Sequence, residues 1–154
     1  MNAAMLAIIN NDNQSFIADE LTLMGSETRT ADGVTEVSST DVIFDTGGGY
    51  TEGYLIVDAT TVAATTDELY EFKLQGSPDS DFGTAANIFD LPCQINIGAG
   101  ETLIAATAAQ DMGADRYVAP FSNRLGKYQF RYLRLYLEVT GSAPSVAFKA
   151  YLTR

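Results

Sequence analysis

Hydrophobic and polar residues alternate with a period of two along most of this chain. Between residues 69 and 75, Tyr70, Phe72 and Leu74 share one side, and three polar side chains share the other. This alternation is typical of an antiparallel strand with one buried face. The same pattern predicts further strands at Val42–Asp45, Tyr54–Thr60, Ile88–Leu91, Glu101–Ala105, Arg116–Phe121, Tyr128–Val139 and Ser145–Leu152.

Turn-forming residues separate these strands, with glycine and proline concentrated at positions 47–49, 76–79, 98–100, 123–126 and 141–144. Seven or eight strands with such turns indicate an all-β fold, either a β-sandwich or a small barrel. We expect an antiparallel β-sandwich of jelly-roll type. Helix is scarce, although Ala105–Met112 fits a short helix that Gly113 would end.

The N-terminal region has a different character. Gln14–Met24 fits a helix and a strand about equally, and an apolar patch followed by Asn10, Asn11, Asp12 and Asn13 resembles a detachable arm. We therefore predict an N-terminal arm or first strand over residues 1–36 and the jelly-roll domain over 37–154. The apolar stretch Ala3–Ile9 is short and follows no basic residue, so we expect neither a secretory signal nor a membrane span.

Charge is segregated along the chain. Residues 1–115 contain two basic and nineteen acidic residues, a balance of 2 − 19 = −17, whereas residues 116–154 contain seven basic residues and one acid, a balance of +6. These sum to the net charge of −11. Such asymmetry favours a recognition surface in the basic part.

Composition also narrows the functional class. The chain has no histidine and one cysteine, Cys93, so it lacks the usual general base near neutral pH and the common zinc ligands. We expect a binding protein that is not an enzyme and carries no cofactor. The excess of acids argues against duplex nucleic acid as a partner. Asp79 and Asp81 flank Ser80 in a turn that resembles part of a calcium loop, and an ordinary Asp-rich turn is the alternative.

Tyr128–Val139 is the most informative predicted strand. Leu133, Leu135 and Leu137 form a core face, while the opposite side carries four aromatic residues that another chain or a long loop of the same chain would cover. Arginine and tyrosine are both favoured in protein interfaces. The predicted partner-binding residues are Arg116, Arg124, Lys127, Tyr128, Phe130, Arg131, Tyr132, Arg134 and Tyr136.

Three segments carry a family resemblance. Arg131–Phe148 (RYLRLYLEVTGSAPSVAF) is similar to the last two strands of the jelly-roll capsid cement proteins of tailed bacteriophages. Leu69–Phe82 (LYEFKLQGSPDSDF) and Val37–Gly47 (VSSTDVIFDTG) resemble two earlier strands of that family, in the same order. Met1–Thr35 lacks the element that often precedes the family's first strand.

The resemblance implies a homodimeric structural protein without catalytic residues. It would be made in the host bacterial cytoplasm, bind the major capsid protein on the outer surface of the virion and stabilise the mature shell. The alternative is a carbohydrate-binding or receptor-binding β-sandwich, in which Tyr128, Tyr132 and Tyr136 would stack on sugar rings. The absence of tryptophan weakens the carbohydrate alternative.

Overall fold

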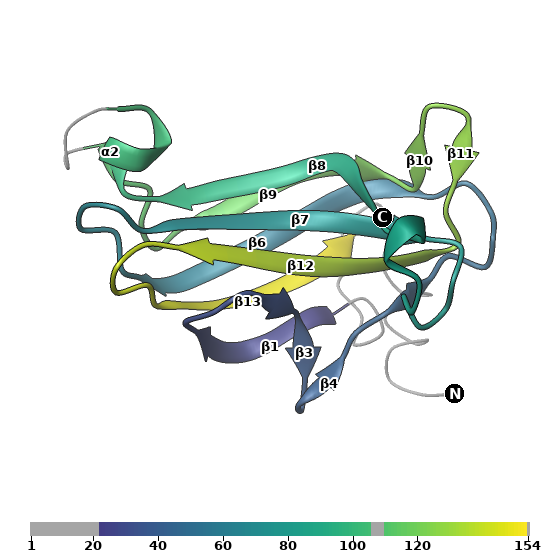
Figure 1. Cartoon of the computed structure of the whole chain (residues 1–154), viewed down its shortest axis with the longest axis horizontal. Helices are drawn as coiled ribbons and strands as arrows, with labels where there is room; N and C mark the ends of the chain where they lie inside the picture. The colour runs from purple at the N-terminus through teal and green to yellow at the C-terminus, as the bar shows by residue number, and fades with distance from the viewer. Residues whose placement is uncertain (1–21, 106–109, 154) are drawn as a thin grey trace, which may run out of the picture.

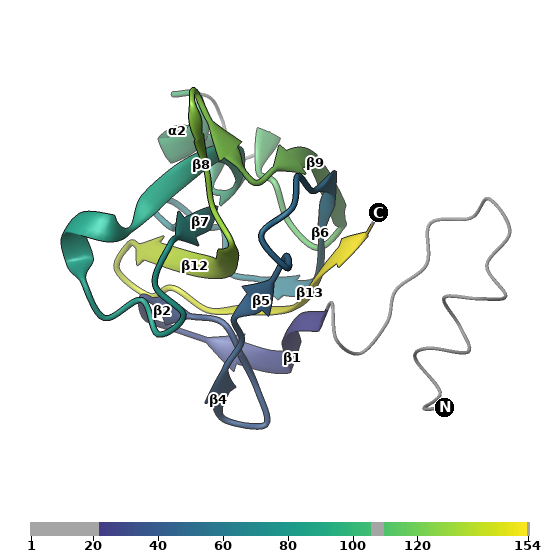
Figure 2. The same ribbon diagram turned by 90° about the vertical axis from the view of Figure 1, so that its right-hand side faces the viewer.

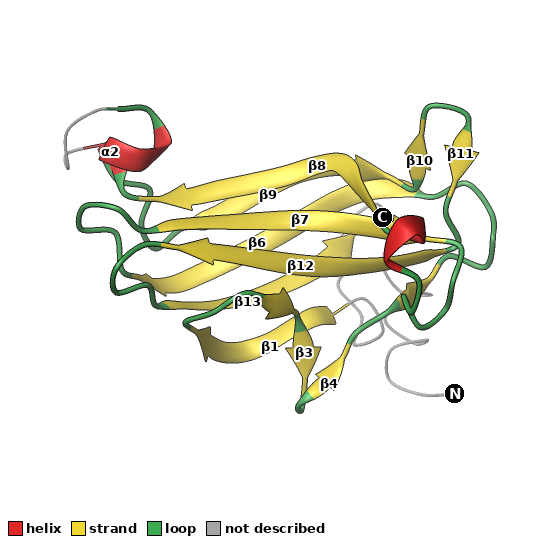
Figure 3. Cartoon of the chain, in the orientation of Figure 1, coloured by secondary structure: helices red, strands yellow, loops and turns green. Residues whose placement is uncertain are grey.

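Most of the described chain is β-strand, arranged in two antiparallel sheets that share one hydrophobic core (Figures 1 and 3). The computed structural model describes residues 22–105 and 110–153. The first sheet has the order β1 (Thr22–Arg29), β13 (Val146–Thr153), β6 (Glu52–Val62) and β9 (Arg116–Ser122). The second contains β12 (Tyr132–Thr140), β7 (Leu69–Ser77) and β8 (Phe89–Gly98), with β2 (Gly33–Val34) and β5 (Phe44–Asp45) both paired to β12. The predicted all-β fold is confirmed.

The remaining elements are short. β3 (Glu36–Val37) pairs with β4 (Thr40–Asp41), and β10 (Arg124–Leu125) pairs with β11 (Tyr128–Gln129). The helical segments in the described residues include a 3₁₀ turn at Ala85–Asn87 and the one-turn helix α2 (Gly100–Leu103). In Figure 1 the β10–β11 hairpin projects from one end of the molecule, and α2 lies at the opposite end. None of the helices in the described part of the chain is long and apolar enough to cross a membrane.

The core lies between the two sheets because each central strand turns one side of its alternating pattern inward (Figure 2). In β12, Leu133, Leu135 and Leu137 are each no more than 1% exposed, as their spacing predicts. Phe72 of β7 meets Phe148 of β13 edge to face, with ring centroids 4.8 Å apart, so this contact joins the sheets.

Several strand predictions are confirmed with small changes in bounds. Leu69–Gln75 lies within β7, Tyr54–Thr60 within β6 and Arg116–Phe121 within β9, and Ser145–Leu152 overlaps β13. Two others have the wrong length. Only Phe44–Asp45 of the predicted strand Val42–Asp45 is β-strand, as β5. In the predicted strand Ile88–Leu91, the last three residues form the start of the longer β8, which begins at Phe89.

β8 continues through Pro92, beyond the predicted end of the strand at Leu91. Proline is tolerated here because β8 lies at the edge of its sheet, where β7 is its neighbouring strand on one side. The pairing with β7 also shifts register across this segment, between the pairs Lys73–Gln94 and Gln75–Asp90. Beyond the proline, Cys93, Ile95 and Ile97 are buried in the core.

The predicted strand Glu101–Ala105 is wrong, because Gly100–Leu103 form α2 and Ala105 has a φ of +51°. β8 ends at Gly98, where a Cβ would lie 2.2 Å from the Glu68 carbonyl oxygen. Gly100 N–H then donates to the Asp111 carboxylate at 2.7 Å, which turns the chain away from the sheet. Within the predicted helix Ala105–Met112, residues 106–109 lie outside the described residues, and Met112 forms a β-bridge with Gly98 instead.

The predicted N-terminal region is described only from Thr22 onward. Thr22–Arg29 form β1, which pairs with β13 at the edge of the first sheet. Residues 1–21, which include the predicted arm and most of Gln14–Met24, lie outside the described residues. The proposed boundary between residues 36 and 37 falls inside β3.

Candidate partner-binding surface

The predicted strand Tyr128–Val139 is broken at Phe130. Tyr128 and Gln129 belong to the β10–β11 hairpin, and β12 begins at Tyr132. Phe130 turns into the core, where it is 4% exposed and its ring stacks on Phe89 with a centroid separation of 5.2 Å. Phe130 therefore lies beneath the surface and not on the outer face where the alternation placed it.

A buried asparagine fixes this break. The Asn123 side chain is inaccessible to solvent, and its Nδ2 donates to the carbonyl oxygens of Phe130 at 2.9 Å and Gly49 at 2.8 Å. Its Oδ1 accepts from Thr51 N–H at 2.9 Å. One side chain thus holds together the hairpin, the loop 46–51 and the start of β6, which satisfies backbone groups that would otherwise be buried without partners.

The β10–β11 hairpin and the loop 46–51 together form the end of the molecule that we call the tip, defined by Tyr50, Arg124, Lys127 and Tyr128. The hairpin turns at Gly126, whose φ of +59° suits a tight two-residue loop. Gln129 Nε2 donates to the Gly48 carbonyl oxygen at 2.8 Å, which attaches the loop to the hairpin.

Cationic side chains lie against exposed aromatic rings at the tip. The Arg124 guanidinium is 5.1 Å from the Tyr50 ring centroid, and Lys127 Nζ is 5.3 Å from that of Tyr128. Tyr50 and Tyr128 are 52% and 57% exposed. Tyr50 also donates its hydroxyl hydrogen to Glu52 at 2.5 Å, and this hydrogen bond raises the pKa of the Tyr50 phenol.

Neither Arg124 nor Lys127 forms an ion pair with any carboxylate whose side chain the structure describes. This is notable in a chain with twenty acidic and nine basic residues. The tip therefore presents two positive charges and two tyrosines to whatever approaches this end, a combination that is frequent at protein interfaces.

Arg131 and Tyr132 lie beside the tip and connect it to β12. The Arg131 guanidinium pairs with Asp45 and also lies over the Tyr132 ring at 5.2 Å. The hydrogen bonds from Arg131 and from Gly47 N–H hold the pKa of the Asp45 carboxyl below its ordinary value. The charge of Arg131 is thus balanced within the chain.

Arg134 and Tyr136 lie further along β12, on the outer face of the second sheet. The Arg134 guanidinium is 4.4 Å from the ring centroid of Phe82, which is itself buried, and Arg134 Nε donates to Gln75 Oε1 at 2.9 Å. Burial lowers the pKa of Arg134. The segment containing Phe82 therefore covers Arg134 on the outer face of β12.

Arg116 is separated from the other predicted partner-binding residues. It begins β9, and the seven residues of that strand place it about 20 Å from the hairpin. Its guanidinium pairs with Asp58 of β6, with Nε–Oδ1 at 2.5 Å and Nη2–Oδ2 at 2.9 Å. The structure thus groups Arg124, Lys127 and Tyr128 at the tip with Arg131 and Tyr132 beside them.

The acidic turn at residues 79–81 uses its carboxylates locally. Asp79 Oδ2 accepts from Asn87 Nδ2 at 2.9 Å, and Asp81 Oδ1 accepts from Gly83 N–H at 2.9 Å. Among the described residues, no group of three or more Cys, Asp or Glu side chains is placed to hold a metal ion. Both carboxylates are therefore engaged in hydrogen bonds that stabilise the turn itself.

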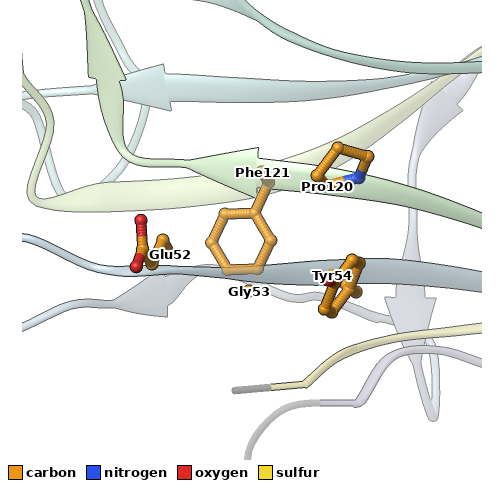
Figure 4. A pocket seen from close by; sticks show the side chains of 5 residues that line it. All are labelled: Glu52, Gly53, Tyr54, Pro120 and Phe121. Atoms are coloured by element: carbon orange, nitrogen blue, oxygen red, sulfur yellow. The ribbon is translucent and has the colours of Figure 1, made fainter.

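The sequence did not predict that Tyr50 belongs to the tip. It also did not predict the exposed apolar residues on the outer face of the first sheet. A pocket of about 420 Å³ at the ends of β6 and β9 is lined by Glu52, Gly53, Tyr54, Pro120 and Phe121 (Figure 4). The signal was present in Leu55, Ile56 and Val57, because consecutive apolar residues in a strand place apolar side chains on both of its faces.

Comparison with known proteins gives no independent family assignment. A scan against protein-family models finds no match to this chain, and a search of curated proteins finds no relative.

Proposed function

We propose that this chain is a capsid cement protein that binds the outer surface of a bacteriophage head as a homodimer and stabilises the mature shell. The observation that carries the proposal is the tip, where Arg124 and Lys127 have no ion-pair partner among the described carboxylates and lie against exposed tyrosines. The major capsid protein is the proposed partner, and the tip would meet acidic or polar groups on it.

The resemblance of Arg131–Phe148 and two earlier segments to the cement family supports the same proposal, as does a sandwich of jelly-roll type. In a jelly roll the chain behaves as a long hairpin that has been rolled up. The first strand therefore pairs with the last, the second with the second-last, and so on to the two middle strands. The pairs β1–β13, β2–β12, β6–β9 and β7–β8 follow that rule. This strand order supports the jelly-roll assignment.

The proposed mechanism is stabilisation by mass action. A protein that binds the assembled shell and not the separated subunits stabilises the shell in proportion to its binding free energy. Two tips on one dimer would act together, so that modest individual contacts give firm attachment. The acidic body would keep the protein soluble in the bacterial cytoplasm before assembly.

A co-sedimentation experiment tests this proposal. Purified heads that lack the protein are mixed with the wild-type chain or with R124Q/K127Q at several salt concentrations. We expect the wild type to sediment with heads and the variant to bind at least about tenfold more weakly at low salt. T61E/Q110E is the matched control, because it changes the net charge by the same amount at exposed positions away from the tip. Equal retention of all three proteins would remove the tip from the contact.

A carbohydrate-binding or receptor-binding module is the second candidate, favoured by the exposure of Tyr50 and Tyr128 at the tip. Binding of the wild-type chain to a glycan array, together with failure to sediment with heads, would favour it over the capsid assignment.

A further inference from the structure

The outer face of the first sheet carries an apolar strip where a solvent-facing sheet would normally be polar. Tyr54 and Ile56 of β6 stand beside Pro120 and Val118 of β9, in the register pairs Tyr54–Pro120 and Ile56–Val118. Tyr54 is 50% exposed and Val118 is 53% exposed. The residues between them along the strands, such as Leu55 and Ala119, are buried in the core.

The two ends of this strip have opposite charge. Beyond Tyr54 lies the exposed carboxylate of Glu52, and beyond Ile56 lies the pair of Asp58 with Arg116. Lys149 of β13 is exposed, stands next to Asp58 in the register and forms no ion pair among the described residues. On the outer face of the sheet itself, the Glu52 end therefore contributes one anion, and the other end contributes two cations and one anion, a balance of +1.

We propose that a second copy of this chain packs on the apolar strip, with its strands running in the reverse direction. A two-fold axis through the middle of the strip would place apolar side chains on apolar side chains. It would also bring the Glu52 end of each copy against the end of the other copy that carries Asp58, Arg116 and Lys149. If the strands of the two copies ran in the same direction, each end of the strip would face the same end of the other copy, with like charges together. The charge pattern therefore favours the reversed arrangement.

This inference rests on the homodimer in the proposed function and names the surface that forms it. Because Glu52 lies at the end of β6 nearest the tip, the reversed arrangement puts the two tips at opposite ends of the dimer. Each tip would then be free to contact a different capsid subunit, which is the geometry that two-point attachment requires.

The first test is the mass of the isolated protein by sedimentation equilibrium over a range of concentrations. The wild type is expected to be a dimer, and V118D is expected to raise the dissociation constant at least about tenfold. I104D is the matched control, because Ile104 is 67% exposed at the opposite end of the molecule, near α2. Circular dichroism establishes that each variant is folded. A dimer unaffected by V118D would overturn the proposal.

A charge exchange tests the direction of packing. E52K and K149E should each weaken the dimer, and E52K/K149E should restore most of the lost affinity, because the exchanged charges meet across the interface. Absence of restoration would contradict the reversed arrangement. A wild-type chain that stays monomeric at high concentration would overturn the proposal.

These measurements use no heads, so they fail or succeed independently of capsid binding. A dimer disrupted by V118D in a protein that does not bind heads would support the dimer surface and reject the capsid assignment.

Discussion

Arg131 and Asp45 form a two-point ion pair, with Nε–Oδ1 and Nη2–Oδ2 distances of 2.9 Å each. The same carboxylate accepts Gly47 N–H at 2.8 Å, so Asp45 links the residue preceding β12 to the loop that carries Tyr50. Bidentate pairing of this kind fixes orientation as well as distance. We infer that the pair positions one side of the tip and leaves the binding charges to Arg124 and Lys127.

Replacing Asp45 by asparagine should loosen the loop 46–51 without unfolding the sandwich. Faster amide hydrogen exchange is expected at Gly47 and Gly48, together with weaker retention on heads. D90N is the control, because the Asp90 carboxylate accepts one exposed side-chain hydrogen bond, from Gln75, on another strand. Identical exchange in the two variants would show that the pair does not order the loop.

Asn123→Ala should be strongly destabilising. Its side chain is fully buried and makes three backbone hydrogen bonds, to Thr51, Gly49 and Phe130, at 2.8 to 2.9 Å. Leaving those groups unsatisfied should cost about 2–4 kcal/mol, measured by urea unfolding. Asn87→Ala removes a single part-exposed hydrogen bond to Asp79 and should cost under about 1 kcal/mol. Equal losses in the two variants would argue against Asn123 as the anchor.

Phe130→Ala and Tyr128→Ala should affect different properties, although only one residue separates them. The first should lower stability, and the second should weaken binding. Phe130 is 4% exposed, so its truncation should lower the free energy of unfolding by about 3–5 kcal/mol. Tyr128 is 57% exposed, so its truncation should leave stability within about 0.5 kcal/mol and weaken binding to heads. A stable F130A variant would contradict the observed break between β11 and β12.

Glu68 should make stability depend on acid pH. Its carboxylate accepts from Thr65 N–H at 2.8 Å and Thr66 N–H at 3.1 Å, and these hydrogen bonds lower the pKa of Glu68 from 4.5 to about 2. A carboxyl with a lowered folded-state pKa stabilises the fold above its unfolded-state pKa, and this contribution is lost as the pH falls from 4.5 to about 2. The stability difference between wild type and E68Q should therefore be largest near neutral pH and shrink below pH 4.5. A difference that stays constant down to pH 2 would refute this role.

The central strands could be predicted from sequence because their alternation is local. Leu133, Leu135 and Leu137 are spaced by two and all face the core. The break at Phe130 could not be predicted in the same way, because the alternation runs through it without interruption. It depends instead on Asn123 and on Gly76, where a Cβ would lie 2.8 Å from the Phe130 ring. Neither contact changes the local alternation of hydrophobic and polar residues.

The tip was only partly predictable for a related reason. Arg124, Lys127 and Tyr128 are neighbours in sequence, so the basic and aromatic composition brings them together. Tyr50 joins them through tertiary contacts, in which Asn123 and Gln129 hydrogen-bond to the loop 46–51 that carries it. Arg116 belongs to the same basic part of the sequence. It lies far from the tip because it begins β9, and the extended strand separates it from the hairpin that follows.

The stability of the shell tests the central claim most directly. Heads lacking the protein are heated with increasing amounts of wild-type chain or of R124Q/K127Q, and the disruption temperature is recorded by scanning calorimetry. Wild-type chain should raise that temperature with concentration until the sites are filled, and the variant should need at least about ten times more protein for the same rise. A disruption temperature that does not respond to the wild-type chain would contradict its assignment as a protein that stabilises the capsid.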